Sequence, residues 1–179
     1  MQELISTLTI WALPVLFAIT LHEAAHGYAA LYFGDATAKL AGRISLNPLR
    51  HIDPVGTIIV PGLIVIMSSL AGAGAMLFGW AKPVPVNFGR LRNPKADMFW
   101  VAAAGPFANL LMALGWALLF KLAVLAPDSV YALPMAKMAD AGIQINAVLM
   151  VLNLVPLPPL DGGRIAVSLL PPGPAYKFA

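Results

Sequence analysis

Two histidines and a glutamate near the start of the chain have the types and spacing of a zinc site. Residues 21–26 read Leu-His-Glu-Ala-Ala-His, which contains the pattern H-E-x-x-H. Positions i and i+4 of a helix lie on one face, so His22 and His26 can bind the same metal ion. Glu23 lies beside them, where its carboxylate can take a proton from a zinc-activated water. The pattern predicts one zinc ion per chain.

The alternative for His22 and His26 is that they are buried polar residues, hydrogen-bonded between helices. Here, however, three ionisable residues lie in a stretch of only five residues inside an apolar segment. Ionisable side chains inside a membrane are costly and are functional-site candidates by default. This cost favours a metal site over structural histidines.

A catalytic zinc site needs a third protein ligand, and the chain has no cysteine to supply it. Asp161 is the best candidate. It follows the prolines that interrupt the last apolar run, in the segment 153–163, which reads Asn-Leu-Val-Pro-Leu-Pro-Pro-Leu-Asp-Gly-Gly. Taken alone, Asp161 could cap the helix that follows it. Beside a histidine pair that lacks a third ligand, the ligand interpretation is favoured.

The composition indicates an integral membrane protein. Of the 179 residues, 60% are hydrophobic and 11% are charged, whereas soluble domains carry about 25% charged residues. The net charge of +3 does not indicate a nucleic-acid partner, because the basic residues lie in loops between apolar segments without interleaved aromatic residues. Basic residues in such loops set the topology against a lipid surface. We expect the lipid bilayer, and no nucleic acid, as a partner.

The elements that must position the zinc site are apolar helices. Residues 4–33 carry the H-E-x-x-H pattern and are predicted to form a first membrane helix, and residues 96–125 a second full-length one. Residues 141–155 begin a last helix, which prolines break from Pro156 onward. Runs of this kind are long enough to span, since a transmembrane helix needs about 20 apolar residues.

Charge asymmetry predicts the topology. The loops at residues 34–56 and 81–95 hold seven Lys and Arg residues between them, and by the positive-inside rule both are cytoplasmic. Two successive loops on one side require an even number of crossings between them. Residues 58–79 are therefore predicted to form a re-entrant hairpin, with a single span as the alternative. The predicted fold is an all-α polytopic membrane protein: a helical bundle with this re-entrant segment and a small β-hairpin at the membrane surface.

The β-hairpin is predicted because polar and apolar residues roughly alternate at residues 37–46. Its exposed edge could pair with an extended substrate through main-chain hydrogen bonds. A hairpin that merely joins two helices is equally compatible with the pattern. His51, close to Asp53 and Pro54, is expected in a solvated turn rather than as a metal ligand.

The chain resembles the site-2 proteases, a family of intramembrane zinc metalloproteases marked by H-E-x-x-H and a later N-x-x-P-x-P-x-L-D-G. Both motifs are present, at residues 22–26 and 153–162, and residues 105–109 match the family's G-P-x-x-N. The resemblance implies that His22, His26 and Asp161 bind zinc and that Glu23 is the catalytic acid/base. It also implies that Asn153 lies near the scissile carbonyl of a membrane-spanning protein substrate.

The loops at residues 34–56 and 80–87 are similar to those of the compact bacterial branch of this family. The resemblance implies a multi-pass protein of the bacterial cytoplasmic membrane that performs regulated intramembrane proteolysis. We expect residues 1–179 to form a single intramembrane metalloprotease domain that lacks the C-terminal membrane helix often found in this branch. The alternative is a cation transporter or channel that uses the same His, Glu and Asp cluster. Glu23 between the two histidines favours the protease.

Overall fold

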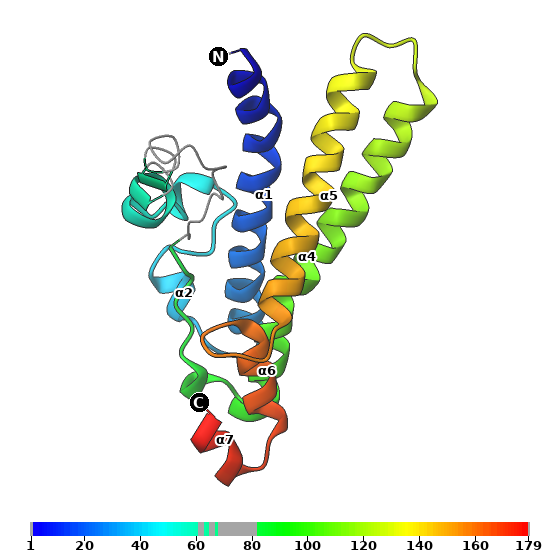
Figure 1. The fold of residues 1–179 in the computed structure, drawn as a ribbon. Helices are drawn as coiled ribbons and strands as arrows, with labels where there is room; N and C mark the ends of the chain where they lie inside the picture. Colours follow the sequence, from blue (N-terminus) through cyan, green and yellow to red (C-terminus); the bar gives the residue numbers. More distant parts are fainter. Residues whose placement is uncertain (1, 61–62, 65–66, 68–81, 179) are drawn as a thin grey trace.

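The computed structural model describes residues 2–60, 63–64, 67 and 82–178, and in these residues it contains helices and loops but no strand (Figure 1). The elements are α1 (Gln2–Tyr32), α2 (Thr37–Leu40), η1 (Pro48–Arg50), η2 (Pro54–Ile59), η3 (Phe88–Arg90), α4 (Pro94–Leu125), α5 (Ala132–Leu154), α6 (Asp161–Leu169) and α7 (Pro172–Phe178). The helical class predicted from the sequence is confirmed.

In the part of the chain that the structure describes, α1, α4 and α5 are long and apolar enough to cross a membrane. Their outward faces are apolar as well as their inner ones. On α4, a row of leucines has between 51% and 69% of its surface exposed: Leu111, Leu114, Leu118, Leu122 and Leu125. Soluble proteins rarely expose apolar patches of this extent. The chain is therefore a membrane protein, as its composition predicted.

The last of these helices begins earlier than expected. The sequence indicated a connection at residues 127–140, whereas α5 already begins at Ala132. Pro134 lies in its first turn, where a missing N–H removes no helical hydrogen bond. Lys137 and Asp140 are exposed on the resulting helix.

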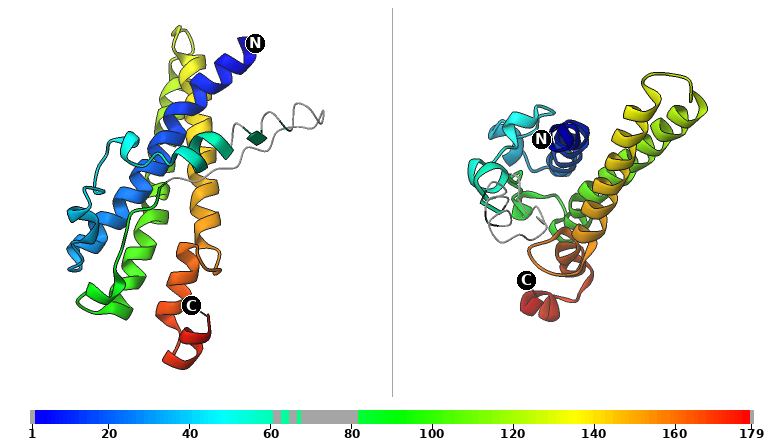
Figure 2. Two further views of the ribbon diagram at one scale, coloured as in Figure 1. Left: turned by 90° about the vertical axis from the view of Figure 1, so that its left-hand side faces the viewer. Right: turned by 45° about the horizontal axis from the view of Figure 1, so that its top comes forward.

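Helix α4 runs antiparallel to α5, and α1 lies against both near the end where α1 stops and α4 starts (Figures 1 and 2). Helices α6 and α7 lie at this same end (Figure 2). Small side chains allow the close approach, since Ala18 and Ala30 of α1 are fully buried and Ala102 of α4 is 1% exposed. Toward the other end, α1 and α5 diverge. The bundle is therefore tightest where the H-E-x-x-H pattern lies.

The strand predicted at residues 37–46 is wrong. Thr37–Leu40 forms the short helix α2, and Gly42 ends the turn after it with a φ of 64°. The cause is the preceding aspartate, because Asp35 Oδ1 accepts a 2.9 Å hydrogen bond from the Thr37 N–H and thereby favours a turn over an extended chain. Because these residues form no β-hairpin, they offer no strand edge with which a substrate could pair.

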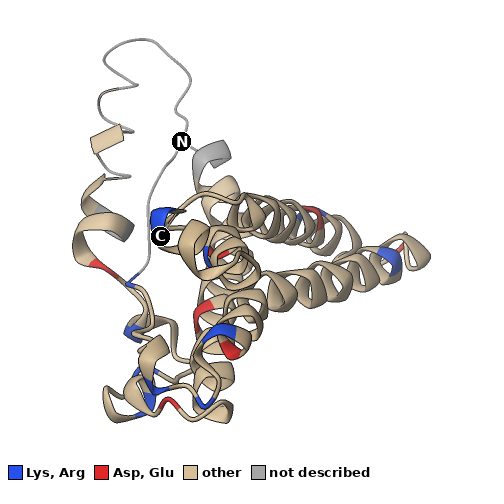
Figure 3. Cartoon of the chain, turned by 90° about the horizontal axis from the view of Figure 1, so that it is seen from below, with Lys and Arg blue, Asp and Glu red and all other residues tan. Residues whose placement is uncertain are grey.

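The two basic loops lie together (Figure 3). The Arg43 guanidinium donates to Lys82 O at 2.7 Å, and the Arg92 N–H donates to Phe33 O at 3.0 Å. Asp35 adds a third link, because its Oδ2 accepts from the Asn87 N–H at 2.6 Å. The re-entrant hairpin was predicted for residues 58–79, most of which lie outside the described residues.

His51 is not in a solvated turn, contrary to expectation. Only 2% of its surface is exposed, and its Nε2 bonds Ser45 O at 2.8 Å. The two loops also meet at its main chain, since His51 O accepts from the Lys82 N–H at 2.9 Å. Within the described residues, the group that could hold a metal does not include His51.

Candidate metal centre

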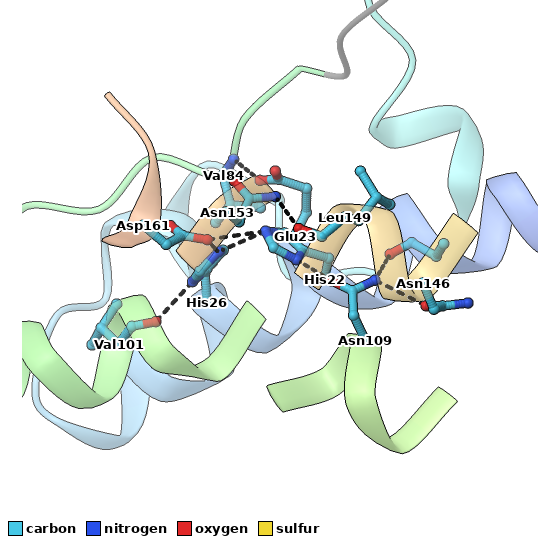
Figure 4. Close-up of polar contacts among 11 residues, drawn as sticks. His22, Glu23, His26, Val84, Val101, Asn109, Asn146, Leu149, Asn153 and Asp161 are labelled. Atoms are coloured by element: carbon cyan, nitrogen blue, oxygen red, sulfur yellow. Dashed lines mark hydrogen bonds and ion pairs between the residues drawn. The ribbon is translucent and has the colours of Figure 1, made fainter. Parts of the chain in front are cut away.

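Helix α1 carries three of the predicted site residues on adjoining positions of one face. The rings of His22 and His26 lie one turn apart, with centroids 4.7 Å from each other and planes at 84°. Both histidines are buried, with 7% and 8% of their surface exposed. Asp161, the first residue of α6, faces them from the other side (Figure 4).

The structure brings His22, His26 and Asp161 together, and they are the one group of three potential metal ligands found among the described residues. The two Nε2 atoms are 3.1 Å apart, and each lies 3.2 Å from Asp161 Oδ2. Tetrahedral zinc with ligands at about 2.0–2.1 Å requires donor atoms roughly 3.3 Å from one another. The three atoms therefore have the mutual spacing of zinc ligands.

The protons on the two imidazoles support the same interpretation. His22 Nδ1 bonds Asn109 Oδ1 at 2.5 Å, and His26 Nδ1 bonds Val101 O at 2.7 Å. Both partners are acceptors, so each neutral ring carries its proton on Nδ1 and presents the lone pair of Nε2. Two such lone pairs and a carboxylate oxygen converge, which is repulsive unless a cation lies between them. The donor set of two imidazoles and one carboxylate fits zinc.

Gly105 of α4 makes the room that the two imidazoles occupy. A Cβ at this position would lie 2.4 Å from His26 Nε2 and 2.6 Å from His22 Cε1. Any larger residue would therefore push the histidines off their present positions. The sequence pointed to Gly105 as a motif position, but not to this contact.

A chain of buried amides lies behind His22. Asn109 of α4 and Asn146 of α5 are both fully buried, and Asn109 Nδ2 donates to Asn146 Oδ1 at 2.9 Å (Figure 4). The sequence drew attention to Asn109 through G-P-x-x-N, whereas Asn146 was missed. The available signal was a polar residue inside an apolar helix, which in a membrane must find a partner.

Glu23 is held by the loop that precedes α4. Its Oε2 accepts a 2.7 Å hydrogen bond from the Val84 N–H, a contact that the sequence did not predict. The flanking residues Pro83 and Pro85 have no N–H, so Val84 is the only main-chain donor in this run of three. A cavity of about 200 Å³ lies between this loop and the side chains of His22, His26 and Asp161.

Asn153 lies in the last turn of α5 and lines the same cavity as Glu23. Its Nδ2 donates to Leu149 O at 3.0 Å. Helix α5 ends at Leu154, and the proline-bearing turn that follows, with a cis Pro158–Pro159 bond, leads back to Asp161. The turn is compact, since a Cβ on Gly162 would lie 2.3 Å from Leu154 O. The prolines thus place Asp161 and Asn153 at one cavity.

Comparisons with known proteins point in the same direction. The chain is 38% identical over 177 residues to "Putative zinc metalloprotease YwhC" of Bacillus subtilis, covering 97% of this chain and 75% of the relative. It is 31% identical over 148 residues to "Putative zinc metalloprotease Rip2" of Mycolicibacterium smegmatis, and 30% identical over 171 residues to the protein of the same name from Mycobacterium tuberculosis. These matches cover 82% and 92% of this chain, but 52% and 61% of the relatives.

The chain belongs to the zinc metalloprotease family that includes YwhC. No family model matches the chain, and no solved structure matches it. The names of the relatives favour a zinc metalloprotease over the cation transporter or channel considered from the sequence. The roles of the individual site residues stay predictions.

Proposed function

We propose that the protein is a zinc-dependent intramembrane endopeptidase of the site-2 protease type. It would hydrolyse peptide bonds in the transmembrane segments of protein substrates, in regulated intramembrane proteolysis at the bacterial cytoplasmic membrane. Residues 1–179 would act as one multi-pass domain. The observation that carries the proposal is the convergence of three acceptor atoms within 3.2 Å beside Glu23, on a helix long and apolar enough to span a membrane.

His22 Nε2, His26 Nε2 and Asp161 Oδ2 would hold one zinc ion. When bound, zinc supplies Lewis-acid chemistry: it acidifies water to a pKa near 7 and polarises a carbonyl. Glu23 would act as the general base. Its Oε2 is engaged by Val84, whereas its Oε1 makes no hydrogen bond among the described residues. Oε1 is therefore the atom that would take the proton and pass it to the leaving amine.

Asn153 would bind the scissile carbonyl. A carboxamide NH₂ group has two donors, and the described contact to Leu149 O occupies one of them. The second donor can turn toward the cavity that Asn153 shares with Glu23. A donor aimed at the developing oxyanion in a site with little water is among the stronger contributions to catalysis.

The loops support a topology in which both basic segments are cytoplasmic. The Lys82 N–H donates to His51 O at 2.9 Å, so the two residues that flank residues 52–81 lie side by side. A single crossing between these residues would put the two atoms on opposite faces of the bilayer. The contact therefore favours a re-entrant segment over a single span.

Cleavage of a membrane-embedded substrate tests the proposed function. The protein is reconstituted with a single-pass substrate, and both zinc content and cleavage are measured. We expect one zinc per chain, cleavage that a chelator abolishes and added zinc restores, and loss of zinc in His26→Ala. Undiminished zinc in His26→Ala would contradict the ligand assignment, and a zinc-loaded wild type that cleaves no membrane substrate would contradict the proposed activity.

A further inference from the structure

The hydrogen bonds of the amide chain behind His22 allow only one orientation of each carboxamide. At its far end, Asn146 Nδ2 donates to Gly142 O at 2.8 Å, which leaves Asn146 Oδ1 facing Asn109. Asn109 must then present its NH₂ group to Asn146, and this group also donates to Ala18 O at 3.3 Å. As a result, Asn109 Oδ1 faces His22 Nδ1. Each step fixes the orientation of the next amide.

The orientation matters because a carboxamide has nearly the same shape when it is turned over. In the reversed orientation, the Asn109 NH₂ group would face His22 Nδ1 and require a lone pair there. The proton of the neutral imidazole would then lie on Nε2, the atom that faces His26 and Asp161. A protonated Nε2 cannot bind a metal ion.

We propose that Asn146 is a positioning residue of the metal centre: through the Asn109 amide it fixes the tautomer of His22 that leaves Nε2 free to bind zinc. The proposal rests on the zinc site of the proposed function. It extends that site to α5, since Asn146 lies on a helix that supplies none of the three ligands. Partners of metal-bound histidines typically change metal affinity about 10–100-fold when they are removed.

A purely structural role for Asn146 makes a different prediction. Buried amides that only join α4 to α5 would affect stability and leave the zinc affinity of the folded protein unchanged. Zinc affinity, measured by competition with a chelator, therefore separates the two roles. We expect Asn146→Leu to bind zinc about 10–100-fold more weakly than wild type. Gln144→Leu, an exposed amide on the same helix, is the matched control and should bind zinc as wild type does.

Two further variants test the orientation itself. Asn146→Asp, neutral when buried, keeps an acceptor for Asn109 and a donor for Gly142 O, and should retain wild-type affinity. Asn109→Leu removes the amide through which Asn146 would act, so no orientation remains for Asn146 to select. In that background, adding Asn146→Leu should change the zinc affinity by less than about two-fold, as independent sites do.

The zinc affinities of these variants distinguish failure of the tautomer proposal from failure of the proposed function. Equal zinc affinity in folded Asn146→Leu and wild type would overturn the tautomer proposal while leaving the zinc site intact. An equal loss of affinity on adding Asn146→Leu to wild type and to Asn109→Leu would also overturn it. If Asn146→Leu is not recovered folded, Asn146→Ser carries the same prediction. A wild type that binds no zinc would instead contradict the metal site itself.

Discussion

The backbone N–H of Val84 donates a 2.7 Å hydrogen bond to Oε2 of Glu23, although the two residues are 61 positions apart. The loop that carries Val84 is itself fixed, because the Arg43 guanidinium bonds Lys82 O at 2.7 Å and Pro83 O at 3.4 Å. The proposed general base is thus oriented by a loop from outside its own helix. The hydrogen bond leaves one carboxylate oxygen toward the cavity.

Removing this single donor should impair catalysis. Val84→Pro deletes the N–H in a run that already contains Pro83 and Pro85, whereas Val84→Ala keeps it. Hydrogen bonds to charged groups contribute about 1.5–3 kcal/mol, so kcat should fall roughly 10–100-fold in Val84→Pro with little change in KM. Steady-state cleavage kinetics of both variants check this. Equal kcat values for Val84→Pro and Val84→Ala would show that the contact does not position Glu23.

The space above Gly105 should be required for zinc binding. Gly105→Ala places a Cβ where His26 Nε2 and His22 Cε1 now lie, so the imidazoles must move and the zinc content should fall. Gly115→Ala is the matched control, because its Cβ on the same helix would meet nothing within 4 Å. That control should bind zinc normally and be stabilised by about 0.5–1 kcal/mol. A full complement of zinc in Gly105→Ala, measured by elemental analysis, would disprove the steric argument.

Acid should weaken the junction between the two basic loops. Burial alone would raise the pKa of Asp35, but hydrogen bonds from Thr37 and Asn87 and the charge of Arg90 outweigh it and lower the pKa below 3.8. A depressed pKa stabilises the fold above the unfolded-state value, and the gain is lost as pH falls through the folded-state value. The contribution should therefore be complete above about pH 5 and decline from about pH 4 downward.

Asp35→Asn tests this pH dependence. The variant should be less stable than wild type at neutral pH, and the difference should shrink below about pH 4, where Asp35 becomes protonated. Thermal unfolding of both proteins from pH 3 to pH 7 measures it. A stability difference that stays constant over this range would rule out an ionised Asp35 as the link.

The two basic loops should lie on one side of the membrane. The chain has no native cysteine, so single cysteines can be placed at Leu40 and Arg90 in these loops and at Val130 in the α4–α5 connection. Leu40 and Val130 are 80% and 82% exposed. We expect an impermeant thiol reagent to label Leu40→Cys and Arg90→Cys from one face and Val130→Cys from the other. Labelling of positions 40 and 90 from opposite faces would exclude the re-entrant topology.

The predictions from the sequence succeeded best for features that depend on local helix geometry. His22 and His26 could be paired because helical spacing puts positions i and i+4 on one face, and Asp161 because the pair lacked a third ligand. The helix spans followed from long apolar runs. The contact of Val84 with Glu23 could not be predicted, because it is made by a backbone N–H brought close by the tertiary fold.

Other predictions from the sequence were wrong, and the structure gives the physical reasons. The alternation at residues 37–46 is too short to separate a strand from a turn of helix, and the Asp35 hydrogen bonds decide for the helix. His51 was expected in water because of its polar neighbours, but main-chain hydrogen bonds between loops distant in sequence bury it. The amide network could not be predicted from the sequence, because Asn146 contacts Asn109 only when α4 packs against α5.

Replacing Glu23 by Gln tests the central claim most directly. The change preserves side-chain size and leaves His22, His26 and Asp161 in place, but removes the proton acceptor. A general base contributes about 10²–10⁴-fold, and the loss should approach the upper end in a site that water cannot easily enter. Cleavage of a membrane-embedded substrate and zinc content are measured on the same preparation. We predict a zinc-loaded, folded protein whose cleavage rate falls by at least about 10²-fold; a zinc-loaded Glu23→Gln that cleaves within about ten-fold of wild type would contradict the proposed mechanism.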